Sequence, residues 1–168
     1  MVTIPRLATE HLVLRSFAPE DFEPYPEMMA NPEVAQYLGE GRPLDRAEAW
    51  RQMSMLLGHW ELRGFGLRAV EKRSTGRFIG RIGCQEPEGF RGLRNCLCVR
   101  QTSLGQGYAR EGAGAALRFA REVLGHTAIT SIVHPANSAS IRAVTRRGGP
   151  RTVEFYGAPS VLYRYPKK

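Results

Sequence analysis

The chain has 168 residues, a length that suits one folded domain with a hydrophobic core better than two. Hydrophobic residues make up 42% of it and charged residues 24%, which is ordinary globular composition and argues against a disordered or fibrous protein. The N-terminus has no apolar segment of signal-peptide length, and no stretch approaches the roughly 18 apolar residues of a membrane span. We therefore expect one domain over residues 1–168, in the cytoplasm and with no membrane partner.

The formal net charge of +8 is unevenly distributed. Residues 1–61 contain five basic and ten acidic side chains, whereas residues 62–168 contain nineteen basic and six acidic ones. This asymmetry favours an anionic ligand or partner for the C-terminal part. Nucleic acid is the weakest candidate, because the arginines are scattered singly and no basic run with interleaved aromatic residues occurs.

The three cysteines, Cys84, Cys96 and Cys98, lack the spacing of a disulfide scaffold. We expect free, buried thiols in a reducing compartment. Cys96 and Cys98 would share one face of a strand, but no second ligand pair nearby completes a zinc set. The sequence therefore predicts no metal site.

The N-terminal half begins with a strand at 11–17, in which Leu12 and Leu14 would share one face. Pro19 and acidic residues then suit a helix start, and Pro24 and Pro26 are expected to shorten or break that helix. Asp45 is a candidate N-cap of a longer amphipathic helix. The apolar stripe predicted for its core face is Ala47, Trp50, Met53, Leu57 and Trp60.

The second half alternates strands and helices. Three strands at 64–72, 76–85 and 93–100 are expected to form an antiparallel meander. A helix follows, closed by Gly125, with the predicted apolar face Ala109, Ala113, Ala116, Leu117, Ala120 and Leu124. The last expected elements are a buried strand at 128–136, a short capped helix at 137–149 and a pair of strands at 152–156 and 160–165.

Between the meander and the second long helix lies the stretch SLGQGYAREG, residues 103–112. Gly105 and Gly107 lack a Cβ, so the backbone can turn through positive φ and a ligand can approach it closely. The unpaired N–H groups of the helix that starts here favour an anion, above all a phosphate. An ordinary strand-to-helix turn is the alternative, since short glycine motifs are often accidental.

The ordered set CLCVRQTSLGQGYAREG, IVHPANSASIRAVTRRGG and EFYGAPSVLYR resembles the GNAT superfamily of N-acetyltransferases. The segment TEHLVLRSFAPEDFEPYPEMMANPEVAQYLG is similar to its RimJ/RimL-like branch. The resemblance covers nearly the whole chain. It implies a single α/β domain of the α+β type, whose mixed, mostly antiparallel sheet is splayed between its fourth and fifth strands and flanked by helices, with acetyl-CoA in the splay.

The resemblance also implies how acetyl-CoA is held. Backbone groups at the end of the 93–100 strand would face the pantetheine, and backbone amides of the glycine turn would hold the pyrophosphate. Arg110 is a further candidate for cationic support. The residues implied to bind acetyl-CoA are Cys98, Val99, Arg100, Leu104, Gly105, Gln106, Gly107, Tyr108, Ala109, Asn137 and Arg142.

Two catalytic residues are implied by the resemblance and by position. Ser140 would pass a proton to the departing CoA thiolate, although Asn137 and Ser140 are also ordinary helix-capping types. The resemblance implies no base directly, because Arg94 stands where relatives often carry a glutamate. Substitutes by location are His134, which we carry as a catalytic candidate, Glu86 and Glu88.

Three functions follow as hypotheses. The first is acetyl-CoA-dependent transfer to a primary amine, either a protein or peptide α-amine or a small molecule. The second is a degenerate acyl-CoA-binding or sensory module, and the third is a basic RNA- or ribosome-associated protein. The acidic N-terminal half would suit a cationic acceptor, Arg94 an acidic one, and Tyr156 and Tyr163 are candidates to line the acceptor pocket. A homodimer is left open.

Overall fold

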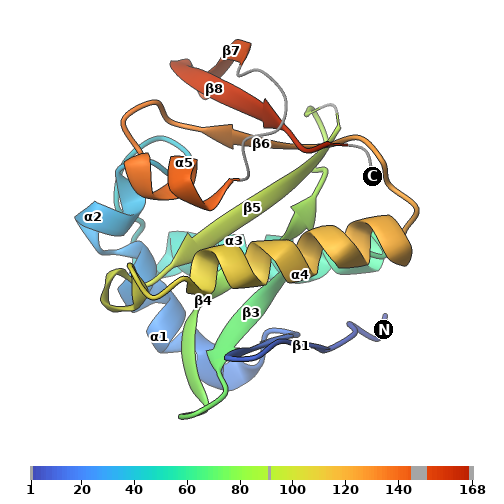
Figure 1. Ribbon diagram of the computed structural model, residues 1–168. Helices are drawn as coiled ribbons and strands as arrows, with labels where there is room; N and C mark the ends of the chain where they lie inside the picture. Colours follow the sequence, from blue (N-terminus) through green and yellow to red (C-terminus); the bar gives the residue numbers. More distant parts are fainter. Residues whose placement is uncertain (1, 91, 145–150, 167–168) are drawn as a thin grey trace.

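The computed structural model describes residues 2–90, 92–144 and 151–166. Within these ranges eight strands form one open, mixed sheet (Figure 1). All neighbouring strands are antiparallel except β5 and β6. The strands in sheet order are β1 (Leu7–Ala8), β2 (Leu12–Arg15), β3 (Leu67–Lys72), β4 (Arg77–Gln85), β5 (Leu93–Val99), β6 (Ile129–Val133), β8 (Ala158–Arg164) and β7 (Arg151–Phe155). The predicted fold class and the antiparallel meander β3–β5 are confirmed, and only β1 is an addition.

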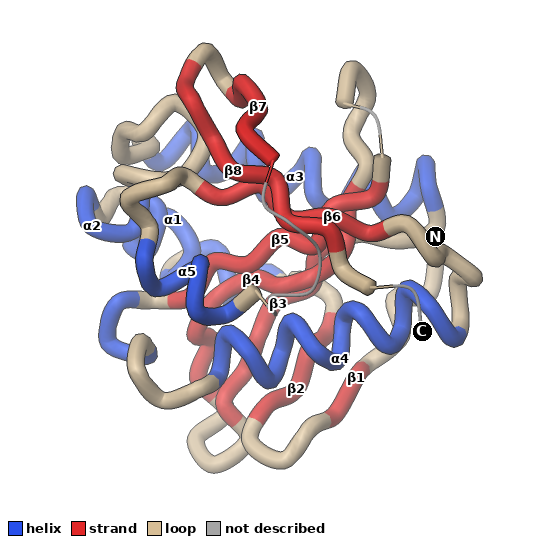
Figure 2. The backbone as a smooth tube through the Cα atoms, turned by 45° about the horizontal axis from the view of Figure 1, so that its top comes forward, coloured by secondary structure: helices blue, strands red, loops and turns tan. Residues whose placement is uncertain are grey.

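Helices cover both faces of this sheet (Figure 2). α4 shares one hydrophobic core with Leu12, Leu14 and Ile82, while α1 and α3 share a second core with Leu67 and Ala69. The helical segments are η1 (Pro19–Phe22), α1 (Pro24–Met29), α2 (Pro32–Ala35), α3 (Arg46–Arg63), η2 (Gln101–Ser103), α4 (Tyr108–Glu122) and α5 (Ser138–Ala143). The proline-rich segment is broken as expected. The part of the predicted 137–149 helix at 145–149 lies outside the described residues.

The start of α3 is confirmed, but its predicted core face is partly wrong. The Asp45 carboxylate accepts the backbone N–H of Glu48 at 2.7 Å, and the Glu48 carboxylate accepts the backbone N–H of Asp45 at 2.9 Å. Ala47 is exposed and Trp50 is 56% exposed. The buried face instead comprises Ala49, Met53, Leu56, His59 and Trp60. Apolar residues occur on two sides of this helix, so its period alone does not select the side that packs.

The predicted face of α4 is confirmed. Ala113, Ala116, Leu117 and Ala120 are buried, and Ala109 and Leu124 near the helix ends are half-buried. α4 therefore sits firmly on the sheet, which fixes the direction in which its N-terminus points.

β5 and β6 separate soon after they pair. Only Leu93 with Ile129 and Arg94 with Thr130 are partners in this parallel pair, and the two strands then diverge (Figure 1). The expected splay between the fourth and fifth predicted strands is thus confirmed. Because β1 precedes them, these are the fifth and sixth strands of the structure.

The described part of the chain contains no helix that is both long and apolar enough to cross a membrane. Nor do its His, Cys, Asp and Glu side chains gather in threes where a metal ion could be held. Cys84 and Cys98 are buried, Cys96 is half-buried, and all three thiols are free.

Candidate active site

Two cavities meet where β5 and β6 separate. The first, here called the turn cavity, has a volume of about 660 Å³ and lies between the end of β5, the η2–α4 turn and α5. The second, the sheet cavity, has a volume of about 470 Å³ and lies over β4 and β5 beneath the β7–β8 turn. Both are lined by Tyr37, Leu38, Leu97, Asn137 and Ser140. A ligand in one cavity can therefore touch a ligand in the other.

The glycine turn forms one wall of the turn cavity. Gly105 and Gly107 have φ angles of +77° and +80°, and an added Cβ would meet no atom within 4 Å at either position. The backbone conformation, and not crowding, therefore requires glycine at these positions. Gly107 is also the N-cap of α4.

Backbone donors gather at this turn. Within the described residues, no protein group accepts a hydrogen bond from the backbone N–H groups of Gly105–Arg110, whereas the N–H of Leu104 donates to the Gln101 carbonyl. The N–H groups of Tyr108, Ala109 and Arg110 point out of the N-terminus of a 15-residue helix, where the helix dipole also favours negative charge.

Two arginines add charge to the same cavity. Arg110 and Arg142 line it, and in the described part of the chain neither forms an ion pair. Arg100 is placed differently: it pairs with Glu27 at 2.6 Å, its N–H donates to the Ile79 carbonyl, and it does not line the cavity.

The other residues expected to bind acetyl-CoA differ in whether they line the turn cavity. Cys98, Val99, Leu104, Tyr108, Ala109 and Asn137 line the turn cavity. The side chain of Gln106 instead donates to the Thr102 carbonyl at 3.2 Å. Because backbone groups alternate direction along an antiparallel strand, the bond from Arg100 to Ile79 leaves the groups of Leu97 and Val99 facing the splay.

Asn137 caps α5, and the Asn137 amide nitrogen and the Ser140 hydroxyl have no hydrogen-bond partner among the described residues. The Asn137 side-chain oxygen accepts the backbone N–H of Ser140 at 3.0 Å and caps α5. This leaves the Asn137 amide nitrogen and the Ser140 hydroxyl at the junction of the two cavities. Capping and ligand contact are therefore compatible here.

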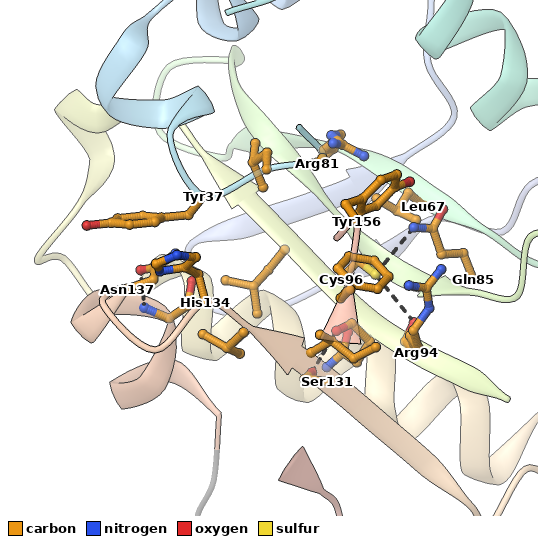
Figure 3. A pocket seen from close by; sticks show the side chains of 18 of the residues that line it. Tyr37, Leu67, Arg81, Gln85, Arg94, Cys96, Ser131, His134, Asn137 and Tyr156 are labelled. Atoms are coloured by element: carbon orange, nitrogen blue, oxygen red, sulfur yellow. Dashed lines mark hydrogen bonds between the residues drawn. The ribbon is translucent and has the colours of Figure 1, made fainter. Parts of the chain in front are cut away.

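His134 lines the sheet cavity beside these residues, and its ring packs against Tyr37 with the ring centres 5.1 Å apart (Figure 3). Its Nδ1 accepts the backbone N–H of Ala136 at 3.2 Å, so in the neutral ring the proton is on Nε2. This geometry favours His134 as a hydrogen-bond donor through Nε2, in place of the base suggested by its location.

The other two substitutes for a base are engaged elsewhere. The Glu86 carboxylate accepts the backbone N–H of Gly92 at 2.9 Å, and Glu88 pairs with Arg63 at 2.9 Å. Neither lines the sheet cavity. The sequence placed these carboxylates near the end of β4 but could not reveal their partners.

The floor of the sheet cavity is one face of β4 and β5. Residues directly opposite each other in an antiparallel pair share a face, and the register pairs Arg81 with Cys98, Gly83 with Cys96 and Gln85 with Arg94. Figure 3 shows Gln85 and Arg94 at one end of this cavity and His134 and Asn137 at the other. The sequence analysis did not identify Arg81 and Gln85 as cavity residues. Their spacing along one face of a strand was the signal that could have found them.

Of the two tyrosines expected at the acceptor pocket, only one lies there. Tyr156 lines the sheet cavity, while Tyr163 packs against the core that contains α4. Tyr156 also has a φ of +51°, an uncommon conformation for a large side chain. This turn conformation places its ring over the cavity (Figure 3).

Comparison with known proteins gives the family. Residues 11–149 match the model of the acetyltransferase (GNAT) domain. The structure is similar to an acetyltransferase from Agrobacterium tumefaciens, with 31% sequence identity, a TM-score of 0.83, and coverage of 98% of this chain and 96% of that one. The chain belongs to the GNAT acetyltransferases, enzymes that use acetyl-CoA.

More distant structures share the fold. A GNAT-family acetyltransferase from Bacillus anthracis is 20% identical, with a TM-score of 0.78 and coverage of 96% of both chains. A ribosomal-protein-alanine acetyltransferase from Vibrio fischeri is 14% identical, with a TM-score of 0.69 and coverage of 98% of this chain and 97% of that one.

The turn cavity fits acetyl-CoA on its own chemistry. A diphosphate needs several hydrogen-bond donors and positive charge, which the free N–H groups of Gly105–Arg110 and the side chains of Arg110 and Arg142 provide. An extended amide-containing arm needs backbone partners, and the Leu97 and Val99 groups face the splay. The thioester end would then reach the junction with the sheet cavity.

Proposed function

We propose that this chain transfers the acetyl group of acetyl-CoA to a primary amine by direct attack of the amine on the thioester. The observation that carries the proposal is the junction itself. A cavity with anion-binding donors meets a second cavity at Asn137 and Ser140, so that donor and acceptor can be held in contact.

The chain's residues would bind the donor as follows. Backbone N–H groups from Gly105 to Ala109, with Arg110 and Arg142, bind the pyrophosphate. Leu97 and Val99 pair with the pantetheine through their backbone, and the Asn137 amide nitrogen donates to it. Donor binding is thus mainly a backbone property of the splay and of the α4 N-terminus.

The transfer itself forms a C–N bond and breaks the C–S bond of the thioester. His134 Nε2–H donates to the carbonyl oxygen as it gains negative charge. Ser140 gives its hydroxyl proton to the departing thiolate and is reprotonated from solvent. The nitrogen loses one proton to solvent after the attack, so no covalent intermediate on the enzyme is required.

The sheet cavity favours a neutral, reactive amine. Its only lining carboxylate among the described residues is Glu40, whereas Arg81 and Arg94 are buried there. Nearby positive charge lowers the pKa of an ammonium group, so the amine can lose its proton without a glutamate at the position of Arg94.

Two further features belong to the proposal. We assign the chain to the RimJ/RimL-like branch because of the N-terminal pattern at residues 9–39. We assign it to the cytoplasm because its free thiols suit a reducing compartment. The acceptor is an amine of a small molecule or of a protein N-terminus, with nucleic acid and a second copy of the chain as less favoured partners.

The proposal is tested by calorimetry with acetyl-CoA, followed in the same sample by thiol release on addition of an amine and peptide panel. Binding followed by amine-dependent thiol release supports it. Binding without release across the panel contradicts transfer and favours an acyl-CoA-binding module. No binding contradicts the assignment of the glycine turn.

A further inference from the structure

Two guanidinium groups are buried in the sheet cavity without a counter-ion. Arg81 is 8% exposed and Arg94 is 5% exposed. All sixteen Asp and Glu side chains lie within the described residues, and none forms a salt bridge with either arginine. Burying an unpaired charge is strongly unfavourable. The two arginines therefore favour an anionic ligand in this cavity.

The nearby Tyr25 phenol and Cys98 thiol do not supply a negative charge to these arginines. Burial raises the pKa of the Tyr25 phenol to about 12, and burial also raises the pKa of the Cys98 thiol beside Arg81. Both groups are therefore neutral near pH 7.

The surroundings of Arg94 favour a planar anion. Its guanidinium lies over the rings of Phe90 and Phe155, with distances of 4.6 and 5.0 Å to the ring centres. The two ring centres are 5.4 Å apart, so both rings attract the guanidinium from the same side. The N–H groups of a guanidinium lie along its planar edge. Arg94 Nε is buried and has no partner in the described part of the chain. A planar carboxylate fits such an edge with two parallel hydrogen bonds.

Gln85 adds an acceptor beside this donor edge. It lies opposite Arg94 in the sheet, and its buried Oε1 has no partner within the described residues. Figure 3 shows the Arg94 and Gln85 side chains next to each other, below Tyr156. The same end of the cavity therefore offers free donors and a free acceptor.

We propose that the acceptor is a primary amine that carries a carboxylate, and that Arg94 binds this carboxylate. The inference rests on the proposed function and names its substrate class. With the carboxylate at Arg94, the rest of the molecule extends toward His134 and Ser140, where the thioester would lie. Arg81 adds positive charge to the same cavity.

This assignment corrects the expectation of a cationic acceptor drawn from the acidic N-terminal half. Most of those carboxylates lie outside the cavity, and Glu40, which lines it, pairs with Arg42 at 3.1 Å. The cavity volume of about 470 Å³ suits a small molecule. A free amino acid and an acidic peptide terminus share the required chemistry, and the experiment separates them.

The test uses matched acceptors with the wild-type chain and acetyl-CoA. Glycine, β-alanine and longer ω-amino acids are compared with their carboxamides, and peptides beginning with Asp or Glu with those beginning with Asn or Gln. We expect a carboxylate to raise kcat/KM by about 10- to 100-fold over its matched amide, the size of a hydrogen-bonded charge pair. A carboxylate preference confined to the amino acids indicates a small-molecule acceptor, and one confined to the peptides an acidic terminus.

Variants assign the effect to Arg94. Arg94→Leu should remove the preference, Arg94→Lys should keep part of it, and Arg94→Glu should reverse it toward cationic amines. Arg51→Gln, an exposed arginine of α3 away from the cavity, should keep the full preference. Acetyl-CoA affinity and melting temperature show that each variant is folded.

A binding readout makes the result independent of turnover. In the presence of CoA, carboxylated amines should raise the melting temperature of the wild type more than their amides do, and not that of Arg94→Leu. Transfer with equal preference for acids and amides overturns this inference but leaves the proposed function intact. Absence of both carboxylate-dependent transfer and carboxylate-dependent stabilisation also overturns it. Failure of the wild type to bind acetyl-CoA would instead contradict the proposed function.

Discussion

The Ser131 hydroxyl donates a hydrogen bond of 2.7 Å to the carbonyl of Asn95, across the gap where the β5–β6 pairing has just ended. The same hydroxyl lies 3.0 Å from the hydroxyl of Tyr165. A side chain thus replaces the next backbone bond of the ladder. It joins the two strands at the base of the splay while their outer ends stay apart.

Ser131→Ala should lower the free energy of unfolding by about 1–3 kcal/mol, because a buried carbonyl loses its partner. Urea unfolding of the variant measures this change. Ser54→Ala, at an exposed serine of α3, is the control and should change stability little. Equal stability of the two variants would contradict the assigned role of Ser131.

Gly107→Ala should destabilise the chain by about 1–2 kcal/mol, since alanine is strained at positive φ. It should also weaken acetyl-CoA binding, because the N–H groups of the turn would be redirected. Gly58→Ala is the matched control: Gly58 lies within α3, and an added Cβ there meets nothing within 4 Å. In a helix interior this change should stabilise by about 0.5–1 kcal/mol. Denaturant unfolding should therefore show stability changes of opposite sign for the two variants, and calorimetry should show weaker acetyl-CoA binding for Gly107→Ala. Stability changes of the same sign would count against the account of the turn.

Ser140→Ala should lower kcat by about 10²-fold, the usual contribution of a general acid. Its affinity for acetyl-CoA should change little, because donor binding depends mainly on backbone groups. Ser138→Ala changes an exposed serine of the same helix and should leave kcat close to wild type. If Ser140→Ala loses affinity and keeps kcat, Ser140 acts only in binding or capping.

His134→Gln should retain more activity than His134→Ala, since the glutamine amide can still donate a hydrogen bond. A base would be lost equally in both variants. Steady-state kcat values of the two variants distinguish a hydrogen-bond donor from a base. Equal decreases in kcat would support the role of His134 as a base.

The capping box of α3 makes stability depend on pH. Hydrogen bonds from the Arg42 guanidinium and from the Asp45 backbone N–H lower the pKa of Glu48 from 4.5 to about 2. A carboxyl whose folded pKa is lowered stabilises the fold above its unfolded pKa, and this contribution is lost as pH falls through the folded value. The melting-temperature difference between wild type and Glu48→Gln should therefore be constant above pH 4.5 and shrink toward pH 2.

Glu122→Gln is the control for this pH series. Glu122 is exposed and forms no ion pair among the described residues, so its difference from wild type should stay small throughout. A Glu48→Gln difference that does not change with pH would contradict the role given to Glu48.

The glycine turn and the helix after it could be predicted from the sequence because their signals are local. Gly105 and Gly107 indicate a turn, and the apolar period after them indicates the helix whose N-terminus points at that turn. Leu104 and Arg100 could not be placed in advance, since their N–H groups donate to Gln101 and Ile79. These bonds depend on how the chain leaves β5.

The sheet cavity could not be predicted because its parts are distant in sequence. Arg94 was noted as an unusual residue, but Phe90 and Phe155 meet it only after the β7–β8 pair folds over the sheet. Arg81 and Gln85 reach the same cavity through the antiparallel register of β4 and β5. The prediction of the buried side of α3 was partly wrong for a related reason, since only tertiary packing distinguishes Ala49 from Ala47.

The most direct test of acetyl transfer between the two cavities is a mass-spectrometric count of products. Acetyl-CoA is mixed with the enzyme and a carboxylated amine, and free CoA and acetylated amine are quantified together. The account predicts equal amounts of the two products, with both reduced in parallel by Ser140→Ala. Free CoA without acetylated amine would show thioester hydrolysis and contradict direct transfer, as would the absence of both products.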